Sequence, residues 1–244
     1  MRFLIIGGTG LIGKKVTQEL HALSHEVVIG TPEKGIDAVT GKGLREAMEG
    51  TDVLIDLSNS NKFDEESAVS FFETAGTRLT SVAASSGIKH YLVLSIVGVS
   101  QLQSIGYMKA KLLQEELVRR SGIPFTIIRS TQFLQFIPFL TQNGTIDNVV
   151  HVSGAAFQPI AAQEVAEFVV DFSLGRPVNG VVEIAGPEKG TIDQFVKRFL
   201  AFSGSSAEVT VDPQSTYMGV VIPGSALVPN GDARLGTHTL EQVL

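Results

Sequence analysis

Three glycines near the amino terminus restrict the fold of this chain more than any other feature. The segment "GGTGLIG" follows an apolar run at 3–7 and precedes a stretch at 11–23 with apolar residues at helical spacing. Glycine permits a tight turn, lets the backbone approach a phosphate, and allows the helix to pack closely on the strand. The N–H groups at the helix start can then hold phosphate oxygens. The segment predicts a pyrophosphate-binding strand–loop–helix unit formed by Gly7, Thr9, Gly10, Leu11, Ile12 and Gly13.

Strands and helices are expected to alternate through the following hundred or so residues. Further short apolar runs, typical of buried strands, lie at 26–30, 52–56, 90–95 and 124–130. Segments with helical patterns lie between them at 43–50, 66–87 and 106–121. Because parallel strands joined through helices form right-handed crossovers, this order predicts an α/β fold built on a doubly wound parallel sheet.

The pattern is less regular beyond residue 130. We expect a helix at 131–140 interrupted by Pro138, a strand at 148–152, a helix at 161–175, a strand at 180–187 and a helix at 191–204. Residues 205–244 are rich in Gly, Pro and Ser and cannot be assigned. Without a repeat or a clear linker, the sequence favours a single domain over 1–244, in which 131–244 contributes a small C-terminal lid on the substrate side.

Composition excludes several classes of function. The net charge is −6 with both signs interspersed, which argues against a nucleic-acid or anionic-membrane partner. The absence of cysteine excludes disulfides and thiolate chemistry, and the five histidines show no metal-ligand spacing. No apolar stretch has the length of a signal peptide or membrane span. We therefore expect a cytoplasmic protein that binds a small-molecule substrate and no metal, while the oligomeric state stays open.

The end of the second strand bears on the choice between the two nicotinamide dinucleotides. An acidic residue there binds the ribose hydroxyls of NAD, whereas a basic one accepts the 2′-phosphate of NADP. The chain reads "VVIGTPEKG", with Gly30 where the acid would stand and with Thr31 and Lys34 close behind. Lys14 and Lys15, just past the glycine loop, can add positive potential. These residues favour NADP, with NAD as the open alternative.

The segment "GYMKAKLLQEEL" places Tyr107 and Lys111 one helical turn apart. It can be an ordinary amphipathic helix, or a pair in which the lysine charge lowers the tyrosine pKa from its usual value near ~10. Ser95 closes the fourth predicted strand, at the sheet edge where open α/β folds bind ligands, and Ser100 competes for the same role. Coming after the glycine loop and the predicted sheet, the pair favours the catalytic interpretation.

These motifs together resemble those of an atypical short-chain dehydrogenase/reductase of the NmrA-like, NAD(P)-binding branch. The resemblance rests on "GGTGLIG", "LSIVGVS" and "YMKAK", with softer similarity in "STQFLQF", "QPIAAQEVA" and "VVEIAGPE". It implies a Rossmann fold in which Tyr107 moves a proton, Lys111 holds the nicotinamide ribose and Ser95 orients the substrate carbonyl. It also implies that the cofactor and substrate pocket is lined by Ser58, Asn59, Thr131, Gln132 and Phe133.

The chain departs from the family pattern at "LSNS" (57–60), which replaces the usual asparagine-alanine-glycine. Three functions remain in view. The first is an NADP-dependent oxidoreductase that transfers hydride to a carbonyl-like group of a small substrate. The second is a non-catalytic NAD(P)-sensing regulator, which the retained Tyr-Lys pair disfavours. The third is a sugar-nucleotide epimerase, for which the C-terminal region offers limited room.

Overall fold

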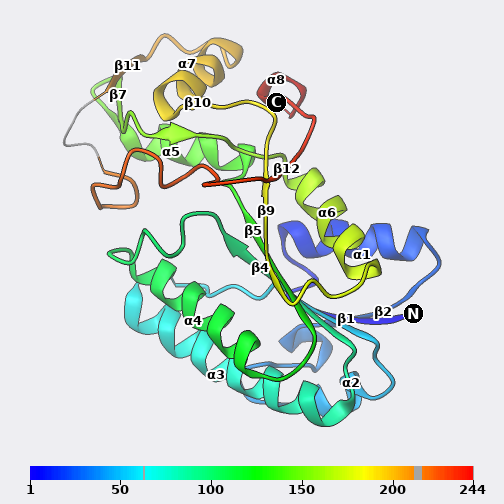
Figure 1. The fold of residues 1–244 in the computed structure, drawn as a ribbon. Helices are drawn as coiled ribbons and strands as arrows, with labels where there is room; N and C mark the ends of the chain where they lie inside the picture. The colour runs from blue at the N-terminus through cyan, green and yellow to red at the C-terminus, as the bar shows by residue number, and fades with distance from the viewer. Residues whose placement is uncertain (63, 212–215, 244) are drawn as a thin grey trace.

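The main body of the protein is a seven-stranded parallel sheet, seen in a computed structural model that describes residues 1–62, 64–211 and 216–243 (Figure 1). The strand order is β12-β9-β5-β4-β3-β1-β2, and every neighbouring pair is parallel. The strands are β1 (Arg2–Ile6), β2 (Glu26–Gly30), β3 (Val53–Asp56), β4 (His90–Ile96), β5 (Phe125–Ser130), β9 (Gly180–Ala185) and β12 (Arg234–Leu235). The predicted doubly wound Rossmann-type fold is confirmed.

Helices cover both faces of this sheet. One face is covered by α1 (Leu11–Ala22) and α6 (Ala162–Leu174), and the other by α2 (Leu44–Met48), α3 (Glu65–Ser86) and α4 (Gly106–Arg120). A short helix, η1 (Pro32–Lys34), follows β2. The strands are buried from both sides, as β1 shows with Phe3, Leu4 and Ile5 at 0% exposure. Their continuous apolar runs are what a sheet packed on both faces requires.

Local sequence signals set the ends of the longest helix, α3. The Asp64 carboxylate accepts a hydrogen bond from the Ser67 N–H at 2.9 Å, which caps its first turn. Gly87 ends it with a φ of 71°, a left-handed conformation that glycine adopts without steric cost. The helix then lies alongside α4, and the two form one layer below the sheet (Figure 1).

A second group of elements lies beyond the carboxyl end of β5, and we call it the cap (Figure 1). It consists of η2 (Leu134–Phe136), α5 (Ile137–Gly144), β6 (Thr145–Ile146), β7 (Val149–Val152), β8 (Ala156–Phe157), β10 (Gly190–Thr191), α7 (Ile192–Phe202), β11 (Glu208–Val211) and α8 (Leu240–Val243). Its strands form a three-stranded sheet, β11-β7-β6, and a pair, β10-β8. Phe157 and Phe195 pack edge to face in its own hydrophobic core, with ring centroids 5.5 Å apart.

The structure differs from the sequence predictions mainly beyond residue 130. Pro138 does not interrupt a helix but lies in the first turn of α5, where a missing N–H removes no intrahelical hydrogen bond. The unassigned tail contains β11, β12 and α8. Within residues 131–244, α6, β9 and β12 belong to the main sheet and its covering layer. No helix in the described ranges combines the length and apolar character needed to cross a membrane.

Candidate active site

The glycine loop connects β1 to α1 and allows a close approach of three backbone segments. A side chain on Gly13 would place its Cβ 2.2 Å from the Gly7 carbonyl oxygen, and one on Gly7, whose φ is 78°, would lie 2.5 Å from the Leu57 oxygen. Gly10 is the N-cap of α1, which has no side-chain cap and no acidic residue in its first turn. The N–H groups of that turn therefore remain available to an anion at the positive end of the helix dipole.

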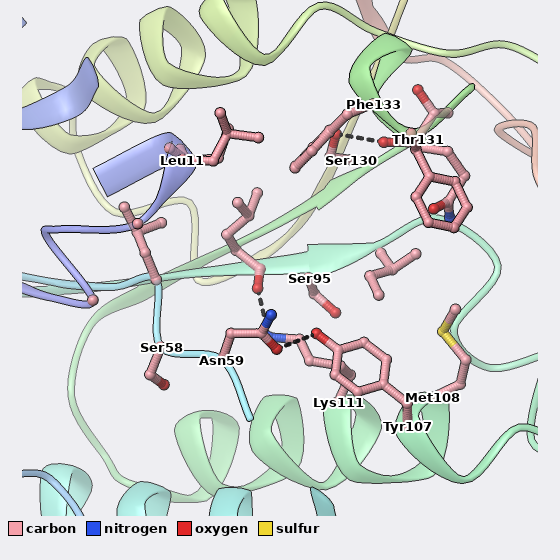
Figure 2. A pocket seen from close by; sticks show the side chains of 18 of the residues that line it. Leu11, Ser58, Asn59, Ser95, Tyr107, Met108, Lys111, Ser130, Thr131 and Phe133 are labelled. Carbon is pink, nitrogen blue, oxygen red and sulfur yellow. Dashed lines mark hydrogen bonds between the residues drawn. The ribbon is translucent and has the colours of Figure 1, made fainter. Parts of the chain in front are cut away.

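A cavity of about 320 Å³ extends from this loop, along the carboxyl ends of the strands, to the cap. Figure 2 shows side chains entering it from α1, from the end of β4, from the segments after β3 and β5, and from α4. Thirteen of the residues predicted from sequence line it: Gly7, Gly10, Leu11, Ile12, Gly13, Ser58, Asn59, Ser95, Tyr107, Lys111, Thr131, Gln132 and Phe133. Elements far apart in sequence thus bring the predicted catalytic and phosphate-binding groups to one space.

Tyr107 lies at the start of α4, with its ring half-buried and its hydroxyl directed at the loop after β3 (Figure 2). The hydroxyl donates a hydrogen bond to Asn59 Oδ1 at 2.8 Å. The ring packs edge to face on Phe72 of α3, with centroids 6.0 Å apart. Burial raises the pKa of Tyr107 to about 12, whereas the sequence analysis expected the neighbouring lysine to lower it. The phenol is therefore neutral at physiological pH and can act as a proton donor.

Lys111 lies one turn further along α4, and its side chain is 4% exposed. Its ammonium donates to the Leu94 carbonyl oxygen at 2.8 Å and to Gln114 Oε1, and it lies 4.8 Å from the centroid of the Phe72 ring. Burial lowers the pKa of Lys111 to about 8, although the nearby Asp56 and Glu115 carboxylates oppose the shift. Lys111 therefore borders the cavity, while its ammonium is buried below the cavity surface and held by Leu94 and Gln114.

This buried lysine predicts a particular dependence of stability on pH. Because the pKa of Lys111 falls from 10.5 to about 8 on folding, the unfolded chain binds more protons between these values. The contribution of Lys111 to the free energy of unfolding should therefore rise by about 3 kcal/mol in total as the pH increases from about 8 to 10.5. We expect the free energy of unfolding of the parent, minus that of Lys111→Met, to rise accordingly in urea titrations at stepped pH.

The matched control for this measurement is Lys109→Met, on the same helix. Lys109 is an exposed lysine that forms an ion pair with Glu65 on the surface. Since its charge is not buried, the corresponding difference should stay nearly flat over the same pH range. A Lys111 difference as flat as that of Lys109 would contradict the depressed pKa.

Ser95, at the end of β4, is held by a buried ion cluster. Its hydroxyl donates to Glu115 Oε1 at 2.5 Å, and Arg129 donates two hydrogen bonds to the same carboxylate at 2.9 and 2.7 Å. Arg119 adds a further bond at 2.7 Å. Burial alone would raise the pKa of Glu115, but the hydrogen bonds from Arg129 and Ser95 lower it overall. The anionic Glu115 therefore fixes the Ser95 hydroxyl proton and leaves its oxygen lone pairs to accept.

Three of the predicted site residues do not line the cavity. Thr9 is exposed at the tip of the glycine loop, Thr31 is buried at the end of β2, and Lys34 is exposed on η1. Thr31 and Lys34 lie beyond β2, where an adenosine ribose would be expected in this fold. Ser100, the competing serine, is also exposed and does not line the cavity.

The structure adds lining residues that the sequence analysis did not name. Most are apolar or small: Leu57, Leu94, Ile96, Met108, Ser130, Phe136, Tyr217 and Met218. Leu57, Leu94, Ile96 and Ser130 lie at or just after strand ends, so the rule that ligands bind at the carboxyl edge could have found them. Tyr217 and Met218 come from the unassigned tail, where the sequence carries no comparable signal.

A family model described as NAD(P)H-binding matches residues 7–173. The matched range starts at the glycine loop and includes Ser95, Tyr107, Lys111 and the segment after β5. The chain belongs to this NAD(P)H-binding family. Its fold agrees with that of the dehydrogenase/reductase class inferred from the motifs.

Relatives and solved structures show how widely this fold is used. The photosystem II assembly factor Ycf39 of Synechocystis sp. is 22% identical over 233 residues, covering 88% of this chain and 72% of the relative. A dTDP-4-dehydrorhamnose reductase from Clostridium acetobutylicum has a TM-score of 0.73 at 16% identity, covering 99% of this chain and 91% of that one. An NADPH-dependent quinone oxidoreductase from Escherichia coli has a TM-score of 0.68 at 19% identity, covering 87% and 78%. At these identities the two structures show a shared fold alone.

The residues present fit a nicotinamide dinucleotide. Gly7 and Gly13 allow the backbone of the loop to pack closely. The start of α1, which has no side-chain cap, borders the cavity, as a pyrophosphate site requires. Further along the cavity Thr131 is 2% exposed, and its hydroxyl has no hydrogen-bond partner among the described residues. A buried hydroxyl without a partner is energetically unfavourable, so this one is suited to a polar group of the cofactor.

Proposed function

We propose that this family member is a reductase that uses an NAD(P)H cofactor to reduce a carbonyl-like group of a small, uncharged substrate. The observation that carries the proposal is the position of the Tyr107 hydroxyl in the same cavity as the glycine loop. When bound, the cofactor supplies the hydride. A screen of carbonyl compounds, followed through the loss of reduced-nicotinamide absorbance, tests it directly, and no consumption above a protein-free control would count against it.

The protonation state of Tyr107 favours reduction over the reverse reaction. A carbonyl that gains a hydride becomes an alkoxide and needs a proton, which a neutral phenol can donate. Oxidation of an alcohol would need the phenolate, and a pKa of about 12 makes that form scarce at neutral pH. In this scheme Asn59 holds the Tyr107 hydroxyl in place until a substrate oxygen competes for the proton.

The other residues take supporting roles in this scheme. The buried ammonium of Lys111 adds positive potential beneath the developing alkoxide and anchors α4 to the Leu94 carbonyl. Ser95, oriented by Glu115, borders the reaction space at the end of β4. The Thr131 hydroxyl and the backbone of the glycine loop are the groups that would hold the cofactor.

The charge of the cavity disfavours the sugar-nucleotide alternative. Lys111 is the one charged side chain that lines the cavity in the part of the chain that the structure describes, and its ammonium already has two partners within the chain. A nucleoside diphosphate needs cationic side chains or N–H groups for its phosphates in addition to those of the glycine loop. An apolar, uncharged substrate fits this lining better.

A second candidate function is that of a dinucleotide-binding protein without turnover, acting through a protein partner. Two observations favour it: both members of the Tyr-Lys pair have partners within the chain, and one relative is an assembly factor. The two proposals differ in whether the protein turns over a substrate. The reductase does so with the Tyr107 hydroxyl as its proton donor, whereas the binding protein has no turnover. The kinetic experiment that separates them is given in the Discussion.

We also propose NADP as the preferred cofactor, with Lys34 as its 2′-phosphate ligand. Lys34 is exposed just beyond β2, whereas Lys15 is already bonded to Gln163 at 3.1 Å. A charge-assisted hydrogen bond contributes about 1.5–3 kcal/mol, so Lys34→Ala should weaken NADPH binding roughly tenfold or more. Binding of NADH should change little, which calorimetric titration of both cofactors would measure.

The control is Lys189→Ala, which removes an exposed lysine in the loop before β10 of the cap. It should leave both affinities unchanged. Glu33, next to Lys34, supplies the competing outcome, because an acid at this position can accept ribose hydroxyls. Tighter binding of NADH than NADPH by the parent, together with its loss in Glu33→Gln, would replace the NADP proposal with one for NAD.

A further inference from the structure

Tyr217 is a buried polar residue of the cavity that the scheme above leaves without a role. It lies in the C-terminal segment, its side chain is 2% exposed, and it forms part of the cavity wall. Its hydroxyl has no hydrogen-bond partner in the part of the chain that the structure describes. Burial raises the pKa of this hydroxyl, so it stays protonated and can donate. An unpaired buried hydroxyl is energetically unfavourable, so a ligand that accepts a hydrogen bond from it gains affinity.

The backbone around Tyr217 holds the ring firmly in this position. Tyr217 and Val220 exchange two backbone hydrogen bonds, at 2.9 and 3.2 Å, across a two-residue turn. The turn residues Met218 and Gly219 both have positive φ, 51° and 81°, as a type I′ turn requires. The ring also packs edge to face on Phe136, with centroids 6.4 Å apart.

The segment that follows is fixed against the loop after β4. The Ala226 carbonyl oxygen lies so close to Gly98 that a Cβ there would come within 1.9 Å of it. Leu227 forms an isolated bridge with Phe157 of β8. Tyr217 is therefore presented to the cavity by a defined turn tied to the fold on its carboxyl side.

The packing divides the cavity into two halves and places Tyr217 in the substrate half. Ile12, Leu57, Leu94 and Phe133 belong to the hydrophobic cluster under the glycine loop. The second cluster, that of the cap, contains Ile96, Tyr107, Met108, Phe136 and Tyr217. The half that holds the proton donor is thus lined by apolar side chains and by the two tyrosines. A substrate reduced beside Tyr107 would contact Tyr217 with another part of its structure.

We propose that Tyr217 determines specificity by donating a hydrogen bond to a second oxygen of the substrate, away from the carbonyl that is reduced beside Tyr107. This inference rests on the proposed function and narrows its substrate class. The substrate class is a compact, uncharged, largely apolar carbonyl compound with two hydrogen-bonding oxygens, as in a quinone or a diketone. Among the described residues, Lys111 is the one charged side chain that lines the cavity, which argues against a carboxylate or a phosphate as the second group.

The test compares two probes with the same bicyclic skeleton, 1,4-naphthoquinone with two carbonyls and 1-tetralone with one. Binding to protein saturated with NADP⁺, the oxidised cofactor that has no hydride to transfer, is measured by calorimetry, and the chain has no cysteine that the quinone could alkylate. The parent should bind the quinone about fivefold to tenfold more tightly than the ketone. Tyr217→Phe keeps the ring and its contact with Phe136, and it should bring the ratio close to one by weakening quinone binding alone.

The control is Val221→Ala in the segment just after the turn, which shortens an exposed side chain that does not line the cavity and should preserve the preference for the quinone. An equal affinity of the parent for both probes, or an unchanged ratio in Tyr217→Phe, would overturn the inference. Failure of the parent to bind either probe would overturn the substrate class. Because binding is measured without turnover, these outcomes are separate from failure of the proposed reductase, which would appear as quinone bound but not reduced.

Discussion

Replacing Tyr107 by phenylalanine is expected to lower the turnover of 1,4-naphthoquinone with NADPH by roughly 10²–10⁴-fold, the contribution of a positioned general acid. The ring contact with Phe72 survives the change, so the fold and the affinity for NADPH should be nearly unaltered. The loss should appear in kcat and in kcat/KM alike, as expected when an interaction made in the transition state is removed. Steady-state kinetics with calorimetric NADPH titration would measure both quantities.

Asn59 provides a comparison for this variant. Asn59→Ala removes the acceptor that holds the Tyr107 hydroxyl but leaves the transferable proton in place. Its effect on turnover should therefore be clearly smaller than that of Tyr107→Phe. If Tyr107→Phe turned over the quinone at the parental rate, the tyrosine would not be the acid. The non-catalytic binding function would become the better account of the site if neither the parent nor Tyr107→Phe reduced the quinone above a protein-free control.

The amino-terminal half of the fold could be predicted because each signal there is local. Glycine is required between β1 and α1 because the loop after β3 leaves no room for a side chain there. A Cβ on Gly7 would lie only 2.5 Å from the Leu57 oxygen. The apolar runs of the strands follow from burial on both faces. The predicted strand ends place Ser95 and the segment after β5 at the same edge of the sheet, and the cavity lies at that edge.

Helix α4 shows where hydrophobic periodicity gives a misleading picture of the site. Ala110, Leu113 and Leu117 lie at helical spacing, which predicts a buried stripe with Tyr107 and Lys111 to one side of it, and of these three Ala110 is fully buried. In the structure Leu113 and Leu117 are half-buried, and Leu117 packs on Gly76 of α3, whereas Lys111, Gln114 and Glu115 are buried. A polar buried face is tolerated because its groups pair with one another, with Asp56 and with Arg129. Such pairing depends on distant segments, and no local pattern reveals it.

The contribution of the cap to the site could not be predicted because it, too, depends on contacts between distant segments. Tyr217 reaches the cavity because a turn with two positive φ angles and a contact with Gly98 place it there. "TYMGVV" does not have the alternation of a strand or the spacing of a helix. The expectation that Lys111 would lower the pKa of Tyr107 failed because it considered charge without burial, and burial dominates at this position.

The structure also makes the glycine loop a sharp test of cofactor binding, since Gly7, Gly10 and Gly13 differ in what a side chain would meet. A Cβ at Gly10 has one neighbour within 4 Å, the Gly7 oxygen at 3.3 Å, and the backbone there is extended. Gly10→Val should therefore fold, with a cost of about 1 kcal/mol for a poorer N-cap. Its side chain would cover the N–H groups that begin α1, so NADPH binding should fall below detection by calorimetry.

Two further variants separate loss of the phosphate site from loss of the fold. Gly13→Ala would press its Cβ to within 2.2 Å of the Gly7 oxygen, so it should lose thermal stability as well as binding. Gly231→Val adds the same side chain as Gly10→Val at an exposed glycine with no heavy atom within 4 Å of its Cβ position. It should bind NADPH like the parent. A folded Gly10→Val protein with parental affinity would show that the dinucleotide does not lie on this loop, and with it the assignment of the cavity as a cofactor site would fail.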